Sequence, residues 1–188
     1  MEPGLTASVY FATLAAFAAS RVRLARGFVH PSVDLKVGPS VVPNAGRGVT
    51  TNRDIMKGQQ IGTYPGHLRT KKEYLEKIMK YPCAAEYCWQ LTTSDWVLDP
   101  TDDKGELLEF VQLVEMLGND VPLLDAFSRP TTLSLINEPP AGGDVNVRVE
   151  ESVNEAYLLA DCPIRAGEEL FLDYGPFYDR SNYVRKSE

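Results

Sequence analysis

The sequence predicts a mainly β fold with a few helices, built as one domain. Two separate segments, residues 55–61 and 164–170, share a pattern in which apolar residues lie three positions before and three positions after a glycine. Residues 86–98 are rich in aromatic and β-branched side chains, which favour strands. Helical periodicity is confined to two stretches, residues 70–79 and 102–117. Short strands joined by tight turns are therefore expected to make up most of the fold.

Each copy of the repeated pattern predicts a strand, a turn and a second strand. Gly58 and Gly167 occupy the tight position of the turn, where glycine adopts backbone conformations that other residues avoid. The chain then continues to Tyr64 in the first copy and to Tyr174 in the second. We therefore expect two short strand pairs, each leading to a tyrosine.

Residues 70–79 are predicted to form a helix because both ends carry helix signals. Thr70 and Glu73 form a capping box, in which each side chain satisfies the backbone donor of the other. Pro82 ends the helix. Four apolar residues are expected to share one face: Tyr74, Leu75, Ile78 and Met79. Two ion pairs at i,i+4 spacing are expected on the surface: Glu73–Lys77 and Glu76–Lys80.

The next two segments are predicted to be a hairpin and a second helix. Residues 86–98 should turn at Ser94-Asp95. Residues 102–117 carry glutamate and glutamine at every third position beside a broad apolar face, and Gly118 suits the position just after a helix. The second helix would lie in a stretch that sets specificity, docks a partner or adds stability.

Composition is that of a soluble domain with an acidic surface. The chain has 188 residues, 44% of them hydrophobic and 24% charged, and a formal net charge of −7. Direct nucleic-acid binding is not expected, because it requires a basic face. The acidic surface suits a lysine-rich protein partner, and equally serves solubility alone. Three cysteines and two distant histidines form no metal-binding pattern and no disulfide framework: Cys83, Cys88, Cys162, His30 and His67.

Residues 1–27 differ from the rest of the chain. Residues 5–19 are uncharged and mostly apolar, and three arginines follow them: Arg21, Arg23 and Arg26. The run is shorter than the roughly 20 residues that a membrane span needs, and its charges lie on the wrong side for a secretory signal. An organelle transit peptide, a membrane contact through residues 5–19 and a peripheral helix or frayed terminus remain alternatives. The expected location is otherwise intracellular, nuclear or cytoplasmic, and the oligomeric state is left open.

Three motifs follow one another along the chain: Gly46-Arg47-Gly48, Asn137-Glu138 with Asn146, and Glu168 to Gly175 with the sequence Glu-Glu-Leu-Phe-Leu-Asp-Tyr-Gly. In this order and roughly at this spacing, the chain resembles the SET-domain protein-lysine methyltransferases. The resemblance covers residues 33–178 and lacks the cysteine clusters that flank many family members. It implies a β-clip fold of short twisted sheets with a C-terminal pseudoknot. The SET domain would span residues 33–175, with an insertion at about 102–133 and a tail at 176–188.

The resemblance implies S-adenosylmethionine as the cofactor. Gly46, Arg47 and Gly48 would contact its methionine part, although an ordinary glycine turn leading into a strand would be the preferred interpretation of this motif alone. Asn137 and Glu138 would contact its adenine. The family's Asn-His-Ser-Cys is here Asn-Glu-Pro-Pro, so Glu138 is expected to act mainly through its backbone. Tyr174 also belongs to the implied cofactor site. Phe177 and Tyr178 would stack on the adenine, with covering of the core as the alternative.

The implied reaction is methyl transfer to a lysine side chain of a protein, with histone as the default substrate. Tyr174 is the first candidate catalytic residue, because its hydroxyl would orient the neutral amine. Tyr64 matches an earlier channel tyrosine of the family, and a role as a core aromatic is the alternative. Neither a metal nor a covalent intermediate is needed. A catalytically silent SET domain that binds a protein or peptide without turnover is the rival function, because the Asn-Glu-Pro-Pro loop is altered.

Overall fold

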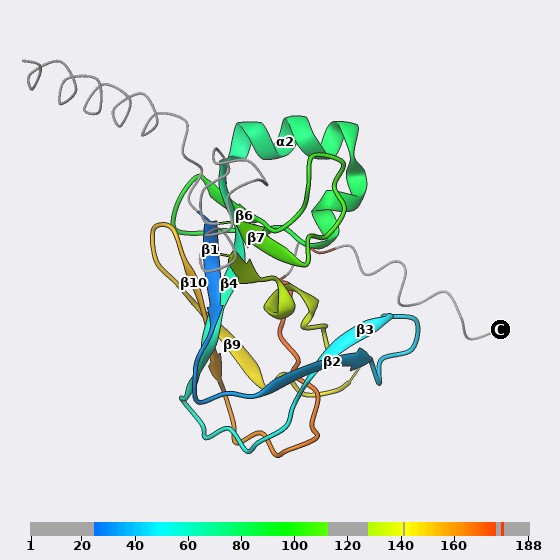
Figure 1. Ribbon diagram of the computed structural model, residues 1–188, viewed down its shortest axis with the longest axis vertical. Coiled ribbons are helices and arrows are strands. Elements are labelled where there is room, and N and C mark those ends of the chain that lie inside the picture. The colour runs from blue at the N-terminus through cyan, green and yellow to red at the C-terminus, as the bar shows by residue number, and fades with distance from the viewer. Residues whose placement is uncertain (1–24, 113–127, 141, 176–177, 179–188) are drawn as a thin grey trace, which may run out of the picture.

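The computed structural model describes residues 25–112, 128–140, 142–175 and 178 (Figure 1). A large sheet contains β1 (Ala25–Val29), β4 (Gln60–Thr70), β5 (Trp89–Gln90), β6 (Trp96–Asp99), β9 (Val147–Glu151) and β10 (Ala156–Ala160). Two small ribbons pair β2 (Leu35–Pro39) with β3 (Arg47–Thr51) and β7 (Phe110–Gln112) with β8 (Ser128–Pro130). The helical elements are α2 (Lys71–Lys80) and the 3-10 turns η1 (Pro82–Glu86) and η4 (Thr132–Leu135). The predicted mainly β architecture is confirmed.

Strand β4 organises the large sheet because three strands pair with it. Strands β1, β10 and β6 all run antiparallel to β4, and the path of the sheet is β5-β6-β4-β10-β9. Strand β1 lies upstream of residue 33, where the domain was expected to begin, and its pairing makes it part of the sheet. Within the described ranges, no helix is long and apolar enough to cross a membrane. The expectations for residues 1–24 fall outside those ranges.

The two copies of the strand–turn–strand pattern pair with each other. Ile55 and Ile164 form an antiparallel bridge, with the backbone N–H of each donating to the carbonyl of the other at 2.8 and 2.9 Å. Gly58 and Gly167 have φ of +78° and +89°, so both turns use the conformation that favours glycine. The turn prediction is therefore confirmed at both sites, whereas the strands expected in the second copy are replaced by isolated bridges at Ile164, Glu169 and Phe171.

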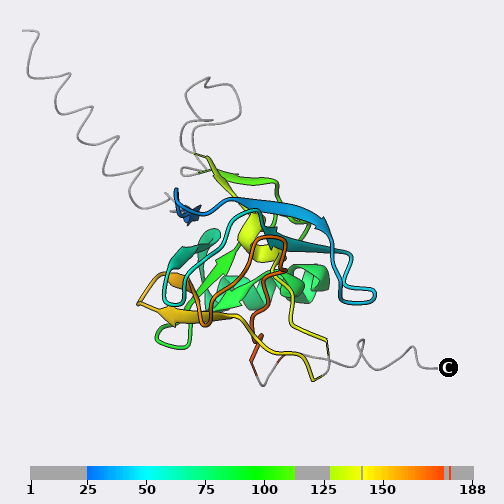
Figure 2. The same ribbon diagram turned by 90° about the horizontal axis from the view of Figure 1, so that it is seen from below.

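The C-terminal segment, residues 169–172, threads between parts of the chain that are far away in sequence (Figures 1 and 2). Leu170 N donates to Val49 O on β3, and Leu172 N donates to Asn137 O. Phe171 O accepts from the backbone N–H groups of Asn146 and Val147. The asparagine loop and strand β3 thus hold this segment from two sides, as the implied pseudoknot requires. The surrounding core is aliphatic: Val49, Ile61, Leu98, Ile136, Leu158, Leu170 and Leu172.

Helix α2 confirms the predicted helix but packs by a narrower face than expected. The capping box is formed: Thr70 Oγ1 accepts from Glu73 N, and Glu73 Oε2 accepts from Thr70 N. Tyr74 is buried, whereas the side chains of Leu75 and Met79 are exposed, contrary to the single apolar face predicted. The reason is that the helix also turns a charged side chain inward, towards β6.

That inward charge is Lys77, which meets a buried carboxylate at the end of β6. Its ammonium lies 2.6 Å from Asp99 Oδ2, and the Arg69 guanidinium contacts the same oxygen. Thr101 donates to the other oxygen through its backbone N–H and its hydroxyl. Burial alone would raise the pKa of Asp99, but the hydrogen bonds of Lys77 and Thr101 and the charge of Arg69 lower it below its ordinary value. Asp99 is therefore the ionised centre that ties α2 to the sheet.

The predicted helix at 102–117 is wrong over its described part, residues 102–112. This stretch forms a turn, a bridge between Thr101 and Leu107, and strand β7. Asp102 Oδ1 accepts from the backbone N–H groups of Lys104 and Glu106, and Gly105 has φ +82°. Because the Asp102 side chain accepts hydrogen bonds from these backbone N–H groups, it competes with the hydrogen bonds that a helix would form. Residues 113–117 lie outside the described residues.

Candidate functional site

A groove with a volume of about 1500 Å³ brings the predicted motifs together. It is lined by the loop from Pro43 to Arg47 and by the stretch from Ala85 to Thr92, which contains β5. Asn137, Tyr174 and Tyr178 line the same groove. Segments separated by some ninety positions in the chain, such as Arg47 and Asn137, therefore share one cavity. The threading of the C-terminal segment is what brings them there.

The two glycines of the first motif have different structural roles. Gly46 lines the groove with φ +71°, and nothing lies within 4 Å of the position where a Cβ would stand. Its backbone is therefore open to a ligand. A Cβ on Gly48 would lie 2.0 Å from Glu169 Oε1. Gly48 thus makes room for a buried carboxylate, a reason that sequence analysis did not identify.

Glu169 is the buried acceptor that joins the motifs. Its carboxylate accepts from Ser40 Oγ and Val41 N, both at 2.7 Å, and from Asn137 Nδ2 at 3.3 Å. Asn137 Nδ2 also donates to Arg47 O at 2.9 Å. Sequence analysis mentioned Glu169 only as part of the third motif and assigned no role to it. The available signal was a charged residue directly before the apolar run 170–172, a position that burial makes costly unless it is hydrogen-bonded.

Glu138 acts through its side chain as well as by its place in the loop. The side chain is buried, and Oε1 accepts from Tyr174 N at 2.8 Å. The side chain thus has a structural role that sequence analysis did not identify, and a contact of the Glu138 backbone with adenine stays a prediction. Because the carboxylate fixes the backbone of Tyr174, the glutamate of the altered Asn-Glu-Pro-Pro loop supports the candidate catalytic residue.

Tyr174 lies in the groove with its hydroxyl fixed. The hydroxyl donates to Ile136 O at 2.8 Å, and the ring meets the Tyr178 ring edge-on with centroids 4.6 Å apart. Both rings line the groove. The Asn137 carbonyl accepts from Leu172 N, and the Glu138 carboxylate accepts from Tyr174 N. Hydrogen bonds therefore hold both the backbone and the hydroxyl of Tyr174. Phe177, predicted to contact the cofactor, lies outside the described residues.

Tyr64 lies one layer behind the groove. Its ring is 6% exposed, and its hydroxyl donates to Tyr87 O at 2.8 Å. Burial, followed by the proximity of Tyr174 and Cys88, raises the pKa of Tyr64 well above its ordinary value. The phenol is therefore a neutral hydrogen-bond donor that supports the groove wall from behind. This position agrees with the core-aromatic alternative, and contact with a substrate stays a prediction.

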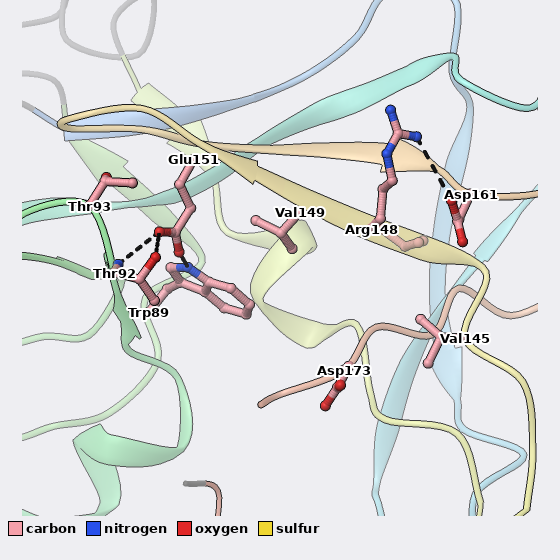
Figure 3. Close-up of a pocket in the computed structure, with 10 residues that line it drawn as sticks. Trp89, Thr92, Thr93, Val145, Arg148, Val149, Glu151, Asp161 and Asp173 are labelled. Carbon is pink, nitrogen blue, oxygen red and sulfur yellow. Dashed lines mark hydrogen bonds and ion pairs between the residues drawn. The ribbon is translucent and has the colours of Figure 1, made fainter. Parts of the chain in front are cut away.

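Trp89 is the groove residue that sequence analysis missed. It was interpreted only as part of the hairpin at 86–98, which the pairing of β5 with β6 confirms. Its ring lies 5.5 Å from the Tyr64 ring, and it lines both the groove and a neighbouring cavity of about 620 Å³ (Figure 3). The signal was the aromatic pair Tyr87 and Trp89 in the predicted hairpin; Trp89 lies on β5, Tyr87 lies before it at the end of η1, and both line the groove.

The charges around the groove favour a cationic ligand. Two cationic residues line it, Arg47 and Lys71, against four carboxylates: Glu86, Asp95, Glu151 and Asp173. Such a balance attracts a basic side chain. Over the part of the chain that the structure describes, no group of histidine, cysteine, aspartate and glutamate side chains is arranged to hold a metal ion.

Comparisons with known proteins agree with this geometry. The family model described as SET domain matches residues 46–175. The Chaetomium thermophilum Polycomb Repressive Complex 2 bound to GSK126 superposes with a TM-score of 0.54 at 18% identity, over 79% of this chain and 16% of that chain. The ctPRC2 structure in an autoinhibited conformation bound to S-adenosylmethionine gives a TM-score of 0.52 at 19% identity, over 76% and 15%. The present chain therefore corresponds to a small part of those proteins, and the likeness is one of fold. The comparison with curated proteins gives no match.

Proposed function

The chain belongs to the SET-domain family, and on that premise we propose that it transfers a methyl group from S-adenosylmethionine to a lysine side chain of a protein. One observation carries the proposal: Tyr174, whose hydroxyl is held on Ile136 O, lines the same groove as Gly46, Arg47 and Asn137. The residues for holding the methyl donor and for orienting the acceptor thus lie in one cavity.

The groove fits S-adenosylmethionine at the end formed by the glycine loop. Gly46 leaves its backbone open, and Arg47 supplies a cation suited to a carboxylate. Asn137 borders the same space, and the Tyr178 ring offers a surface for an aromatic base. When bound, the group supplies a methyl activated by a positive sulfonium. The S-adenosylmethionine present in the ctPRC2 neighbour supports this choice.

The acceptor must arrive as a neutral amine, because an ammonium has no free electron pair. Free lysine has a pKa of about 10.4, and an apolar, aromatic site lowers it by disfavouring the charged form. Trp89 and Tyr174 provide such walls. Tyr174 holds the amine in line with the methyl group, so the rate gain comes from alignment and exclusion of water. A histone is the default substrate, in keeping with the acidic lining.

The proposal is tested first by calorimetric titration of S-adenosylmethionine into the full chain. Arg47→Ala and Asn137→Ala are the comparison variants, with circular dichroism to check folding. The exposed Arg47 side chain makes the first of these the milder change. We expect saturable binding that both variants weaken, and no binding to the folded chain contradicts the proposal.

Methyl transfer is then measured with labelled S-adenosylmethionine on an array of lysine-centred peptides that includes core histone tails. The matched array carries arginine in place of the central lysine, and Tyr174→Phe is the inactive reference. Label on lysine peptides alone supports the proposed reaction. Binding of S-adenosylmethionine and of peptides without any transfer favours the silent binding module instead.

A further inference from the structure

The carboxylate of Glu151 joins two hairpins that are far apart in sequence. Glu151 is the last residue of β9, and its Oε1 accepts from Trp89 Nε1 at 2.8 Å. Its Oε2 accepts from the backbone N–H and the hydroxyl of Thr92, at 2.7 and 2.5 Å. Figure 3 shows the side chain reaching from β9 to both partners. Hydrogen bonds to an ionised acceptor are about twice as strong as neutral ones, so this three-donor contact is a firm clamp.

The clamp is separable from the packing of the two turns. Thr93 Oγ1 donates to Ser152 O at 2.7 Å, and Ser94 Oγ donates to Val153 O at 2.6 Å. These bonds hold the same two turns together and do not involve Glu151. Loss of the Glu151 carboxylate should therefore leave the turns in contact while freeing the indole N–H.

Trp89 is the group that the clamp controls. Its ring is inclined by 43° to the Tyr64 ring, whose position is fixed by the bond to Tyr87 O. The indole has a single donor, and the acceptor it uses is Glu151. Trp89 lines both the groove and the neighbouring cavity, as do Thr92, Glu151 and Asp173, so the clamp lies where the two spaces share residues. Without its acceptor, the indole gains freedom to turn towards either space.

Resting on the proposed function, we infer that Glu151 is a positioning residue that holds the Trp89 indole as the wall contacting the aliphatic stem of the substrate lysine. Asn137 is hydrogen-bonded to Arg47 O and Glu169, whereas Glu151 is hydrogen-bonded to Trp89 and Thr92. Its removal should therefore weaken binding of the lysine side chain and leave binding of the methyl donor unchanged.

The test uses Trp89 as its own reporter. The chain has two tryptophans, so Trp96→Phe leaves Trp89 as the only one. In this parent, Glu151→Ala removes the whole clamp, and Glu151→Gln keeps an acceptor for the indole but not for both Thr92 donors. Glu150→Gln is the matched control, because Glu150 is the neighbouring carboxylate on β9, is 58% exposed and binds Arg148.

Three measurements are made on each protein. Emission and acrylamide quenching report the environment of Trp89, and calorimetry measures affinity for S-adenosylhomocysteine. Quenching of Trp89 by N-acetyl-lysine methylamide, with S-adenosylhomocysteine present, measures binding of the lysine side chain. Glu151→Ala should red-shift the emission and weaken the lysine amide about tenfold. Affinity for S-adenosylhomocysteine should stay within about twofold, because the sites are separate. Glu151→Gln should fall between Glu151→Ala and the parent, and Glu150→Gln should match the parent.

The outcomes separate this inference from the proposed function. Unchanged emission and unchanged lysine-amide affinity in Glu151→Ala overturn the inference. So does a parallel loss of S-adenosylhomocysteine binding and of thermal stability, which would mark a merely structural role. A parent that binds S-adenosylhomocysteine, but whose Trp89 does not respond to the lysine amide, overturns the inference and leaves cofactor binding standing. A folded parent that binds no S-adenosylhomocysteine contradicts the proposed function itself.

Discussion

The two copies of the strand–turn–strand pattern have the same turn but lie in different structural surroundings. In both turns, a side chain three residues on accepts from a backbone N–H: Gln59 Oε1 from Met56 N at 3.0 Å, and Glu168 Oε2 from Arg165 N at 2.9 Å. The first copy continues into β4, the most heavily paired strand of the sheet, and buries its tyrosine, Tyr64. The second threads between other segments and presents Tyr174 to the groove. Equal local sequence signals thus lead to a support residue in one copy and a candidate catalytic residue in the other.

The largest expected difference between the copies lies at the second position after the turn glycine. Glu169→Ala should lower the free energy of unfolding by about 3 kcal/mol, because Ser40, Val41 and Asn137 lose a buried acceptor. Gln60→Ala, the corresponding change in the first copy, should cost less than about 1 kcal/mol. Urea unfolding of both variants measures the difference. Equal losses in the free energy of unfolding would show that the two positions contribute equally to stability, contrary to this prediction.

Removal of the tyrosine hydroxyls should separate catalysis from support. Tyr174→Phe should reduce methyl transfer roughly a hundredfold, because the group that orients the amine is lost. Tyr64→Phe should reduce it less than about tenfold and cost about 1 kcal/mol of stability, because its hydroxyl bonds to Tyr87 O behind the groove. Turnover under saturating S-adenosylmethionine, together with thermal unfolding, checks both. A larger loss of activity in Tyr64→Phe would reverse the assignment.

Alkaline pH should destabilise the first copy through Tyr64. Burial raises the pKa of its phenol, so the folded chain keeps a proton that the unfolded chain loses near pH 10. The unfolded state then binds fewer protons, and the free energy of unfolding falls above about pH 10 by up to about 1.4 kcal/mol per pH unit. Below pH 10 the contribution is fully present. Urea unfolding between pH 8 and about 11 should show a shallower decline in Tyr64→Phe, and identical slopes would contradict this account.

The turn glycines should give the smallest difference between the copies. Gly58→Ala and Gly167→Ala each place a side chain at positive φ, with nothing within 4 Å of the new Cβ. Each should cost about 1–2 kcal/mol through backbone strain alone, with methyl transfer unchanged. Denaturant midpoints of the two variants should agree, and a marked difference would show that the turns are not equivalent.

Local signals predicted the parts of the fold that depend on near neighbours in the chain. The capping box of Thr70 and Glu73 and the hairpin around Ser94-Asp95 are confirmed, because their partners lie within a few residues. The helix predicted from residue 102 was wrong, because Asp102 takes the backbone donors and β7 pairs with β8, a strand sixteen or more positions away. Leu75 and Met79 were expected to share one apolar face with Tyr74, but they are exposed, because periodicity alone cannot tell which part of a helix surface meets the sheet.

The sequence by itself determined the family, the turn glycines and the identity of Tyr174 and Asn137 as candidates, since motif order and residue chemistry are properties of the chain alone. Only the tertiary structure decided that Gly48 serves Glu169, that Glu138 holds Tyr174, and that Glu151 clamps Trp89. Each of these contacts joins segments more than thirty positions apart. Burial removes a charged or polar group from water, so the group must find a hydrogen-bond partner within the protein. Only the folded chain brings that distant partner within reach.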